Sequence, residues 1–283
     1  MRIGIICHPT YGGSGVMATE LGNFLGRQGH SIHVISNALP VRLDPLNGNI
    51  NFHEVMVDAY PLFQYQPYEL ALASTIVEIV RKEQLEILHV HYAIPHAYAA
   101  YMAREILKDQ SIFIPVITTL HGTDITLVGK KPVCKAAVCF SINHSNYVTA
   151  VSKSLKEQTE SLFEIKNPIE VIPNFVNIAG YGRADGELRQ SFASKNQSII
   201  CHVSNFRPVK RIMDVIKIFN KIQEEKDSIL IMVGDGPDRV AAEQLVDQLD
   251  INEKVFFRGK TFDVKSMLGI SDIPSIDFTS KVL

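Results

Sequence analysis

Short apolar runs alternate with longer segments of helical periodicity along the first part of the chain. The short runs are rich in isoleucine and valine, which favour buried strands, and they span residues 2–7, 31–35, 85–91, 112–119 and 147–151. The longer segments carry apolar residues three or four positions apart and predict helices over residues 16–28, 68–82, 96–108 and 154–163. Strands that alternate with helices in this way are typical of a parallel sheet covered by helices.

The alternation restarts after a break at Lys166-Asn167-Pro168 and a polar stretch at residues 180–187. The later predicted strands span residues 169–172, 198–203, 228–233 and 254–257, and the later helices residues 211–221, 238–249 and 264–269. Two such blocks predict an α/β protein with two Rossmann-like domains, residues 1–166 and 167–283, that face each other across a cleft. In such sheets, ligands bind outside the carboxyl ends of the strands.

A glycine-rich loop joins the first predicted strand to the first predicted helix. Gly13, Ser14 and Gly15 stand at this junction, where backbone N–H groups can approach an anion and the helix start adds partial positive charge. A tight turn without a ligand would use the same glycines. The loop also fits the G-x-G-x-x-A dinucleotide pattern, but the second strand ends in Ser36-Asn37, without the acidic residue that would hold a ribose. The residues therefore favour an anion site over a nicotinamide cofactor.

Polar residues also end the later strands of the first domain. His89 and His91 share one face of their predicted strand, and Tyr92 takes the other. Such a histidine pair can bind a metal, but no third ligand is evident, so packed or substrate-facing histidines are favoured.

Thr119 and His121 follow the next predicted strand in the same manner. Their place at a strand end favours contact with a substrate. The alternative is a loop that Thr123 or Asp124 caps at the start of a helix.

A cationic loop follows the predicted strand over residues 198–203 in the second domain. Asn205, Arg207, Lys210 and Arg211 lie before a predicted helix. Three cations at a helix start predict a second anion site, and a solvated basic turn is the alternative. The later segment Gly234-Asp235-Gly236-Pro237 is interpreted as a turn. The chain has no Asp-x-Asp pair, so cations and helix starts, rather than a bound metal, are expected to neutralise a diphosphate.

Composition and charge narrow the expected partners and cellular location of the protein. Of the 283 residues, 46% are hydrophobic and 20% charged, and the net charge of −2 gives no reason to expect nucleic acid or a membrane surface as partner. The chain shows no signal peptide and no apolar run of spanning length, so we expect a cytoplasmic protein. Cys7, Cys134, Cys139 and Cys201 are then expected to be reduced thiols, because they lack partners at zinc-site spacing.

Several segments together resemble the family 4 retaining glycosyltransferases, which have the GT-B fold. The resemblance runs from Met1 to about Asp272 and is closest to the members that act in bacillithiol biosynthesis. It rests on the segments Gly12-Gly13-Ser14-Gly15-Val16, Phe63-Gln64-Tyr65, His89-Val90-His91-Tyr92-Ala93-Ile94-Pro95-His96, Thr119-Leu120-His121-Gly122-Thr123-Asp124, Ser204-Asn205-Phe206-Arg207 and Gly234-Asp235-Gly236-Pro237.

This resemblance implies transfer of GlcNAc from UDP-GlcNAc to the hydroxyl of L-malate, with retention of configuration, no cofactor and no metal. It implies that Ser14, Tyr92 and Thr119 contact the malate and that His121 faces the transferred sugar. It also implies that Arg207 and Lys210 bind the diphosphate, with Asn205 in the same binding loop and Gly13 and Gly15 near the donor phosphates. Such enzymes often form homodimers.

The resemblance stops after Ser271-Asp272. Family members continue there with a pair of glutamates that bind the donor sugar and the ribose, whereas residues 273–283 contain no glutamate. We therefore expect weak donor binding and a second domain with an unpaired sheet edge. Three other functions stay open, namely a protein that binds the acceptor alone, a glycosyltransferase for another nucleotide sugar, and a nicotinamide oxidoreductase.

Overall fold

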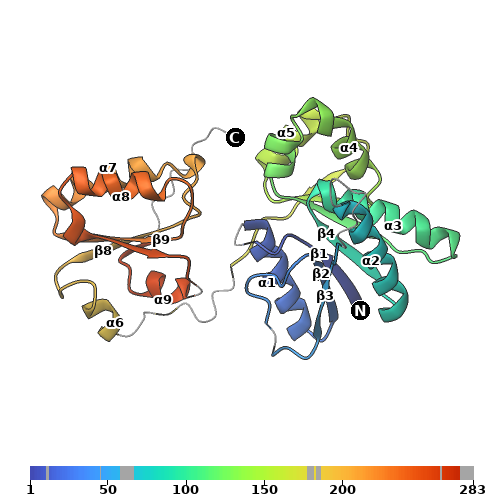
Figure 1. Ribbon diagram of the computed structural model, residues 1–283, viewed down its shortest axis with the longest axis horizontal. Coiled ribbons are helices and arrows are strands. Elements are labelled where there is room, and N and C mark those ends of the chain that lie inside the picture. The colour runs from blue at the N-terminus through green and yellow to red at the C-terminus, as the bar shows by residue number, and fades with distance from the viewer. Residues whose placement is uncertain are drawn as a thin grey trace. The chain divides into compact units, whose positions relative to one another are not determined.

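The computed structural model describes residues 1–10, 13–44, 46–57, 67–176, 182, 186–261 and 263–274. The chain forms two compact units, Met1–Phe175 and Val176–Val282, each with its own parallel sheet and helices (Figure 1). The boundary predicted after residue 166 precedes strand β7 (Ile169–Val171), which the structure joins to the first sheet. Gly12, residues 63–65 and residues 275–283, on which parts of the sequence interpretation rest, lie outside the described residues.

The first unit contains a seven-stranded sheet in the order β3-β2-β1-β4-β5-β6-β7. Every neighbouring pair is parallel. The strand order reverses between β1 and β4, which makes this pair the topological switch point where ligands of such sheets bind. Besides β7, its strands are β1 (Arg2–Ile6), β2 (Ser31–Ser36), β3 (Ile50–Glu54), β4 (Ile87–His91), β5 (Val116–Leu120) and β6 (Tyr147–Ala150).

Helices cover the two faces of this sheet unequally. Helix α1 lies on one side of β1–β3 and α2 and α3 on the other (Figure 1). Helices α4 and α5 extend the second layer over β5–β7. In the described part of unit 1, the opposite face of β5–β7 carries no helix, which leaves room there for a cavity. The helices are α1 (Gly13–Arg27), α2 (Tyr68–Glu83), α3 (Tyr98–Asp109), α4 (Pro132–Asn143) and α5 (Lys153–Leu162), with π-helical segments η1 (Ala93–Ala97) and η2 (Thr123–Val128).

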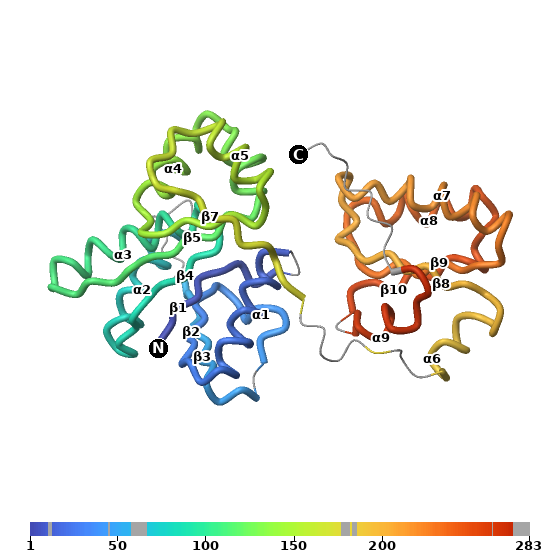
Figure 2. The backbone as a smooth tube through the Cα atoms, turned by 180° about the vertical axis from the view of Figure 1, so that it is seen from behind, coloured from blue at the N-terminus to red at the C-terminus, as the bar shows by residue number. Residues whose placement is uncertain are grey.

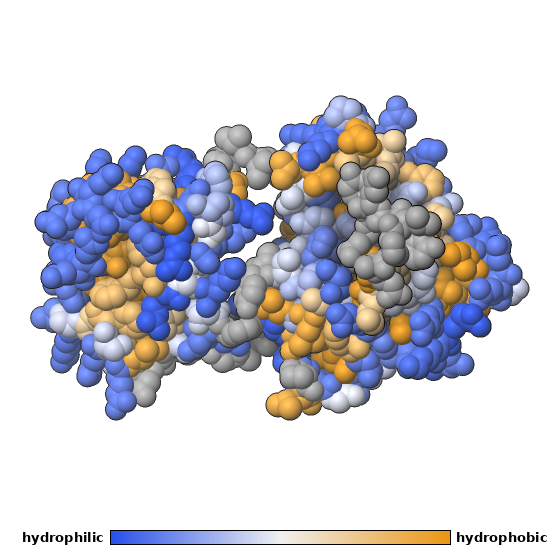
Figure 3. Space-filling model, viewed as in Figure 1, coloured by the Kyte–Doolittle hydropathy of each residue, from blue (hydrophilic) through white to orange (hydrophobic). Residues whose placement is uncertain are grey.

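The second unit has a parallel sheet in the order β10-β9-β8-β11, with α7 and α8 on one face and α6 and α9 on the other (Figure 2). All of β9 is buried, as expected for a central parallel strand. The outer surface of α7 and α8 is mostly hydrophilic (Figure 3). The strands are β8 (Ser198–Val203), β9 (Ser228–Val233), β10 (Val255–Gly259) and β11 (Ile273–Pro274). The helices are α6 (Gly186–Gln190), α7 (Ile212–Glu225), α8 (Arg239–Gln248) and α9 (Val264–Gly269), with short 3₁₀ turns η3 (Pro208–Lys210) and η4 (Asn252–Lys254).

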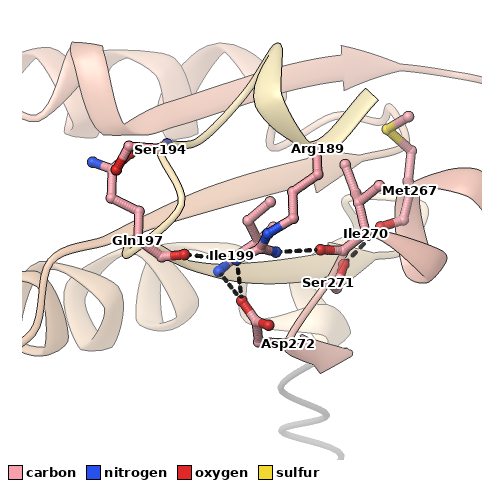
Figure 4. A network of polar contacts seen from close by, with 8 residues as sticks. All are labelled: Arg189, Ser194, Gln197, Ile199, Met267, Ile270, Ser271 and Asp272. Carbon is pink, nitrogen blue, oxygen red and sulfur yellow. Dashed lines mark hydrogen bonds and ion pairs between the residues drawn. The ribbon is translucent and has the colours of Figure 1, made fainter. Parts of the chain in front are cut away.

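One guanidinium fastens both ends of this unit to β8 (Figure 4). Arg189 of α6 donates to the carbonyls of Ile270 and Gln197, each at 2.7 Å, and to Oδ2 of Asp272 at 2.9 Å. The same Asp272 oxygen accepts the Ile199 amide at 2.8 Å. Burial opposes ionisation of Asp272, but the amide and the guanidinium outweigh it and hold the pKa of Asp272 below its ordinary value. We refer to these contacts as the Arg189–Asp272 network.

Candidate functional site

A cavity of about 390 Å³ lies over the uncovered sheet face of unit 1. Its lining comes from α1, from strands β4–β7 and the residues that follow them, and includes Met17, His91, Thr119, His121, Thr149 and Phe175. The parallel register explains the gathering, because His91 pairs with Thr119 and Thr119 pairs with Thr149. Side chains at paired positions point to the same face of a sheet. Of the predicted site residues in unit 1, Thr119 and His121 line this cavity.

The polar side chains of the cavity hold one another in place. Thr119 Oγ1 lies 2.8 Å from His89 Nε2 and 2.8 Å from Thr149 Oγ1. His91 Nδ1 lies 2.8 Å from His121 Nε2. The rings of His89 and His91 stack at 4.6 Å, which confirms that the two histidines share a face. A hydroxyl can form three hydrogen bonds, so Thr119 keeps one position for a ligand.

Burial keeps these histidines uncharged. It lowers the pKa of His89 and of His121 to about 4, and the pKa of His91 well below its ordinary value, with neighbouring imidazoles adding to the effect on His91 and His121. At neutral pH each ring therefore offers one N–H donor and one acceptor but no positive charge. The cluster can orient a hydroxyl group or a sugar, and the neutralisation of an anion must come from other groups.

Tyr92 connects this cluster to the first strand. Its ring stacks on His121 with centroids 5.7 Å apart and meets the His8 ring edge-on at 5.0 Å. His8 lies two residues after the end of β1, and Tyr92 directly follows β4. Tyr92 therefore lies at the switch point, beside the cavity rather than in its lining.

The glycine-rich junction is built around one close approach. A Cβ atom on Gly15 would lie 2.5 Å from the His8 carbonyl oxygen and 2.7 Å from that of Thr10, so only glycine fits there. Gly13 is exposed at the first position of α1, where a Cβ would meet nothing within 4 Å, and Ser14 is half-buried. The start of α1 thus lies close to the segment that follows β1, where an anion site at a helix start is expected.

The predicted residues of the second unit share one loop after β8. Arg207 is exposed and Lys210 half-buried, and neither forms an ion pair within the described part of the chain. The buried Oδ1 of Asn205 has no hydrogen-bond partner among the described residues. Arg211, counted in the sequence as a third free cation, instead donates to Asp214 at 2.6 Å, because it stands at the N-cap of α7 beside an acidic first turn. Two cations, rather than three, are therefore free to meet an anion.

The sequence interpretation missed three features of these two sites. Thr149 contacts Thr119, and only the alternation along β6 could have placed it on the cavity face. The Gly234 turn packs directly against the loop after β8, because a Cβ on Gly234 would clash with the carbonyl of Ser204. Asp124 does not cap a helix as one alternative held; Gly122 is the N-cap of η2, and the Asp124 carboxylate accepts backbone amides before it.

Two findings limit other classes of site. Among the described residues, no three histidine, cysteine or carboxylate side chains are grouped to hold a metal ion. In the same part of the chain, every helix is too short or too polar to cross a bilayer.

Comparison with known proteins gives matches over both units. Residues 11–179 match Glycosyltransferase Family 4, and residues 185–275 match Glycosyl transferases group 1. The N-acetyl-alpha-D-glucosaminyl L-malate synthase of Bacillus anthracis is 46% identical over 275 residues, which cover 96% of this chain and 71% of that protein. The uncharacterized glycosyltransferase MJ1607 of Methanocaldococcus jannaschii is 25% identical over 88% of this chain and 65% of its own length.

Solved structures share the fold at low sequence identity. Anabaena Alr3699/HepE, crystallised in complex with UDP and glucose, superposes with a TM-score of 0.75 at 16% identity and covers 97% of this chain, which spans 73% of that one. Sequence identity at this level carries the fold alone, so the likeness extends to the two sheets and their helices.

Proposed function

The chain belongs to glycosyltransferase family 4, and from this membership we propose that it transfers GlcNAc from UDP-GlcNAc to the hydroxyl of L-malate with retention of configuration. Its fold is that of the GT-B glycosyltransferases. The observation that carries the proposal is the 46% identity with the B. anthracis L-malate synthase, which extends over both units.

In this proposal unit 1 binds L-malate. Ser14, Tyr92 and Thr119 contact the acceptor, and His121 faces the transferred sugar. In support, Thr119 has one hydrogen-bonding position left, and the neutral His121 can donate to or accept from a sugar hydroxyl. The neutral histidines of this unit offer L-malate hydrogen bonds and no positive charge.

Unit 2 binds the nucleotide diphosphate. Arg207 and Lys210 neutralise the phosphates. The unpartnered side-chain oxygen of Asn205 accepts a hydrogen bond from a hydroxyl of UDP-GlcNAc. Gly13 and Gly15 bring backbone amides of α1 towards the same phosphates. Because the imidazoles of unit 1 are neutral, the charge that develops on the leaving UDP is stabilised by these two cations and the helix start.

The proposed reaction needs no protein base. The L-malate hydroxyl oxygen bonds to the anomeric carbon on the face that UDP leaves. The bond from that carbon to the phosphate oxygen breaks, and the departing phosphate takes the hydroxyl proton. The products are GlcNAc-malate and UDP. We further propose that the protein acts in the cytoplasm, where nucleotide sugars are made, and as a homodimer, which sedimentation velocity would measure.

The test uses the whole chain with radiolabelled UDP-GlcNAc and L-malate, and anion exchange separates the products. We expect an anionic labelled product that requires L-malate and whose NMR coupling constant identifies the α-anomer. Succinate, which lacks the hydroxyl, is the matched negative control. Calorimetric titration with L-malate accompanies the assay.

Each other outcome contradicts the proposal in a definite way. L-malate binding without transfer at any donor concentration indicates a protein that binds the acceptor alone. Transfer from UDP-glucose but not from UDP-GlcNAc indicates another nucleotide-sugar glycosyltransferase. Failure of L-malate to bind at all excludes it as the acceptor.

A further inference from the structure

A fully buried carboxylate lies beneath the two strand-end loops that carry Tyr92 and His121. Asp124 is 0% exposed, within the first turn of η2 after β5. The proposed function gives it no contact with a substrate. Burying a carboxylate is costly unless several donors satisfy it, so its retention here needs a physical reason.

The donors come from both loops. Asp124 Oδ2 accepts the backbone amide of Ala93 at 3.2 Å, and Ala93 directly follows Tyr92. Asp124 Oδ1 accepts the amides of His121 at 3.2 Å and Gly122 at 2.9 Å. One side chain thus bridges the residue after β4 and the residues after β5.

Each loop contains a residue with positive φ. Tyr92 has φ 94°, a region that residues with a Cβ atom rarely adopt, whereas Gly122 has φ 111°, which is open to glycine. Such conformations persist where the surrounding structure over-determines them. The Ala93 and Gly122 amides that follow or occupy these positions are two of the three that Asp124 accepts. The carboxylate therefore holds the geometry in which the Tyr92 and His121 rings stack at 5.7 Å.

We propose that Asp124 is a positioning residue, which sets the Tyr92 and His121 loops in register so that acceptor and transferred sugar meet at one place. This inference rests on the proposed function for the roles of Tyr92 and His121. Asp124 acts through backbone amides and touches no substrate atom. Burial raises the pKa of Asp124 to about 6, with the amides opposing that rise, so at neutral pH the carboxylate is ionised and accepts at both oxygens.

Two variants and one matched control test the idea. Asp124→Ala removes all three contacts. Asp124→Asn keeps one accepting oxygen, which the two amides of the β5 loop can use, and places an NH₂ group opposite the Ala93 amide. Asn167→Ala is the control, because the Asn167 side chain also makes three hydrogen bonds to backbone, to the carbonyls of Ile142, Asn143 and Ser145. Ile142 and Asn143 end α4 and Ser145 lies just before β6, and neither these residues nor Asn167 line the cavity.

The first measurement is ligand binding and transfer. We expect Asp124→Ala to lower kcat/KM for L-malate about 100-fold and Asp124→Asn about 10-fold, since small misplacements of reacting groups have effects of this size. UDP affinity, which in this account depends on Arg207, Lys210 and the start of α1, should change less than about twofold, because the Asp124 carboxylate contacts none of these groups. In a urea titration, Asn167→Ala should lower the free energy of unfolding about as much as Asp124→Ala does. Its kcat/KM for L-malate should stay within about threefold of that of the unmodified chain. Equal losses of kcat/KM in Asp124→Ala and Asn167→Ala would overturn the proposal.

The second measurement does not depend on the substrate. Hydrogen exchange read by mass spectrometry should show faster exchange in residues 91–98 and 119–126 together for Asp124→Ala, and mainly in residues 91–98 for Asp124→Asn. Faster exchange confined to residues 119–126 in both variants would refute the bridge. If the unmodified chain neither binds L-malate nor transfers to it, the proposed function fails, and this exchange pattern alone still decides whether Asp124 couples the loops.

Discussion

The two units bind their proposed ligands by opposite physical means. In unit 1 the ligand-facing groups are half-buried, uncharged and hydrogen-bonded, as Thr119, His89 and His121 show. In unit 2 the corresponding groups, Arg207 and Lys210, are charged and more exposed, and have no ion pair in the described part of the chain. A rigid neutral site selects by shape and hydrogen bonding, whereas two free cations attract any phosphate at long range.

This contrast assigns different tasks to the two units. In the proposed function, selectivity for the acceptor resides in unit 1, where a displaced hydroxyl leaves a buried partner unsatisfied. In the same proposal, transition-state charge is stabilised from unit 2. Salt should therefore weaken donor binding more than acceptor binding, because screening acts on exposed charges.

The largest expected effect is on stability in acid. Unit 1 contains nine of the ten histidines, and burial lowers the pKa of His89, His96 and His121 to about 3 or 4, below their value in the unfolded chain. Their stabilising contribution is complete above pH 6.5 and is lost as pH falls towards those values, at about 2 kcal/mol each by pH 5. The pKa of Asp124 is raised to about 6, so protonation of this carboxyl stabilises the fold as pH falls. This gain is only about 1 kcal/mol over the same pH range.

Unit 1 should therefore unfold at much lower urea concentration at pH 5 than at pH 7, with unit 2 changed less. The chain has no tryptophan, and eight of its nine tyrosines lie in residues 1–175, so tyrosine fluorescence follows unit 1. Far-UV circular dichroism follows both units. A fluorescence midpoint that does not fall with pH would contradict neutral, buried histidines.

The next effect concerns the cations. Lys210→Ala should lower kcat/KM for UDP-GlcNAc by roughly 30- to 1,000-fold, or about 2–4 kcal/mol, because a preorganised cation acts on the charge of the leaving group. Lys217→Ala, at an exposed position of α7, is the matched control. Steady-state kinetics at low and high salt measure both variants. A loss below threefold in Lys210→Ala would remove the proposed diphosphate role.

The smallest expected effect sharpens the neutral side of the contrast. Thr149→Val keeps the shape of the side chain but removes the hydroxyl that lies 2.8 Å from Thr119 Oγ1. L-malate affinity should fall about fivefold, or about 1 kcal/mol, since one hydrogen bond that orients Thr119 is lost. Thr159→Val also removes a buried hydroxyl, in this case from α5, where it donates to the Leu155 carbonyl. Its L-malate affinity should stay unchanged; equal effects of the two variants would show that Thr149 is structural only.

Most strands of the two sheets could be predicted from the sequence, because buried parallel strands appear there as nearly continuous apolar runs. Strands β1, β2, β4, β8 and β9 lie where the runs indicated. Strand β3 (Ile50–Glu54) was not predicted, because it is an edge strand with partly exposed polar positions and no apolar run. Helix α4 was missed as well, since its buried residues Val138, Ser141 and Ile142 form only a short stripe.

The candidate site was predicted in part for a similar reason. The rule that ligands lie at strand ends located Thr119 and His121, and both line the cavity. Contacts between neighbouring strands depend on which residues the sheet register pairs. The Thr119–Thr149 and His91–His121 contacts join residues 30 positions apart and could not be derived from one sequence. The pairing of Arg211 with Asp214 lies within one helical turn, and the i,i+3 spacing of these two residues could have predicted it.

The Arg189–Asp272 network also constrains the order in which the protein is made. Its ion pair joins residues 83 positions apart, so a nascent chain can close it only after Asp272 has emerged from the ribosome. Until then α6 and the start of β8 lack their partner from the far end of unit 2. Unit 1, whose sheet is complete by β7, can fold while the second unit is still being synthesised. The acceptor site would thus form on the ribosome before the donor site exists.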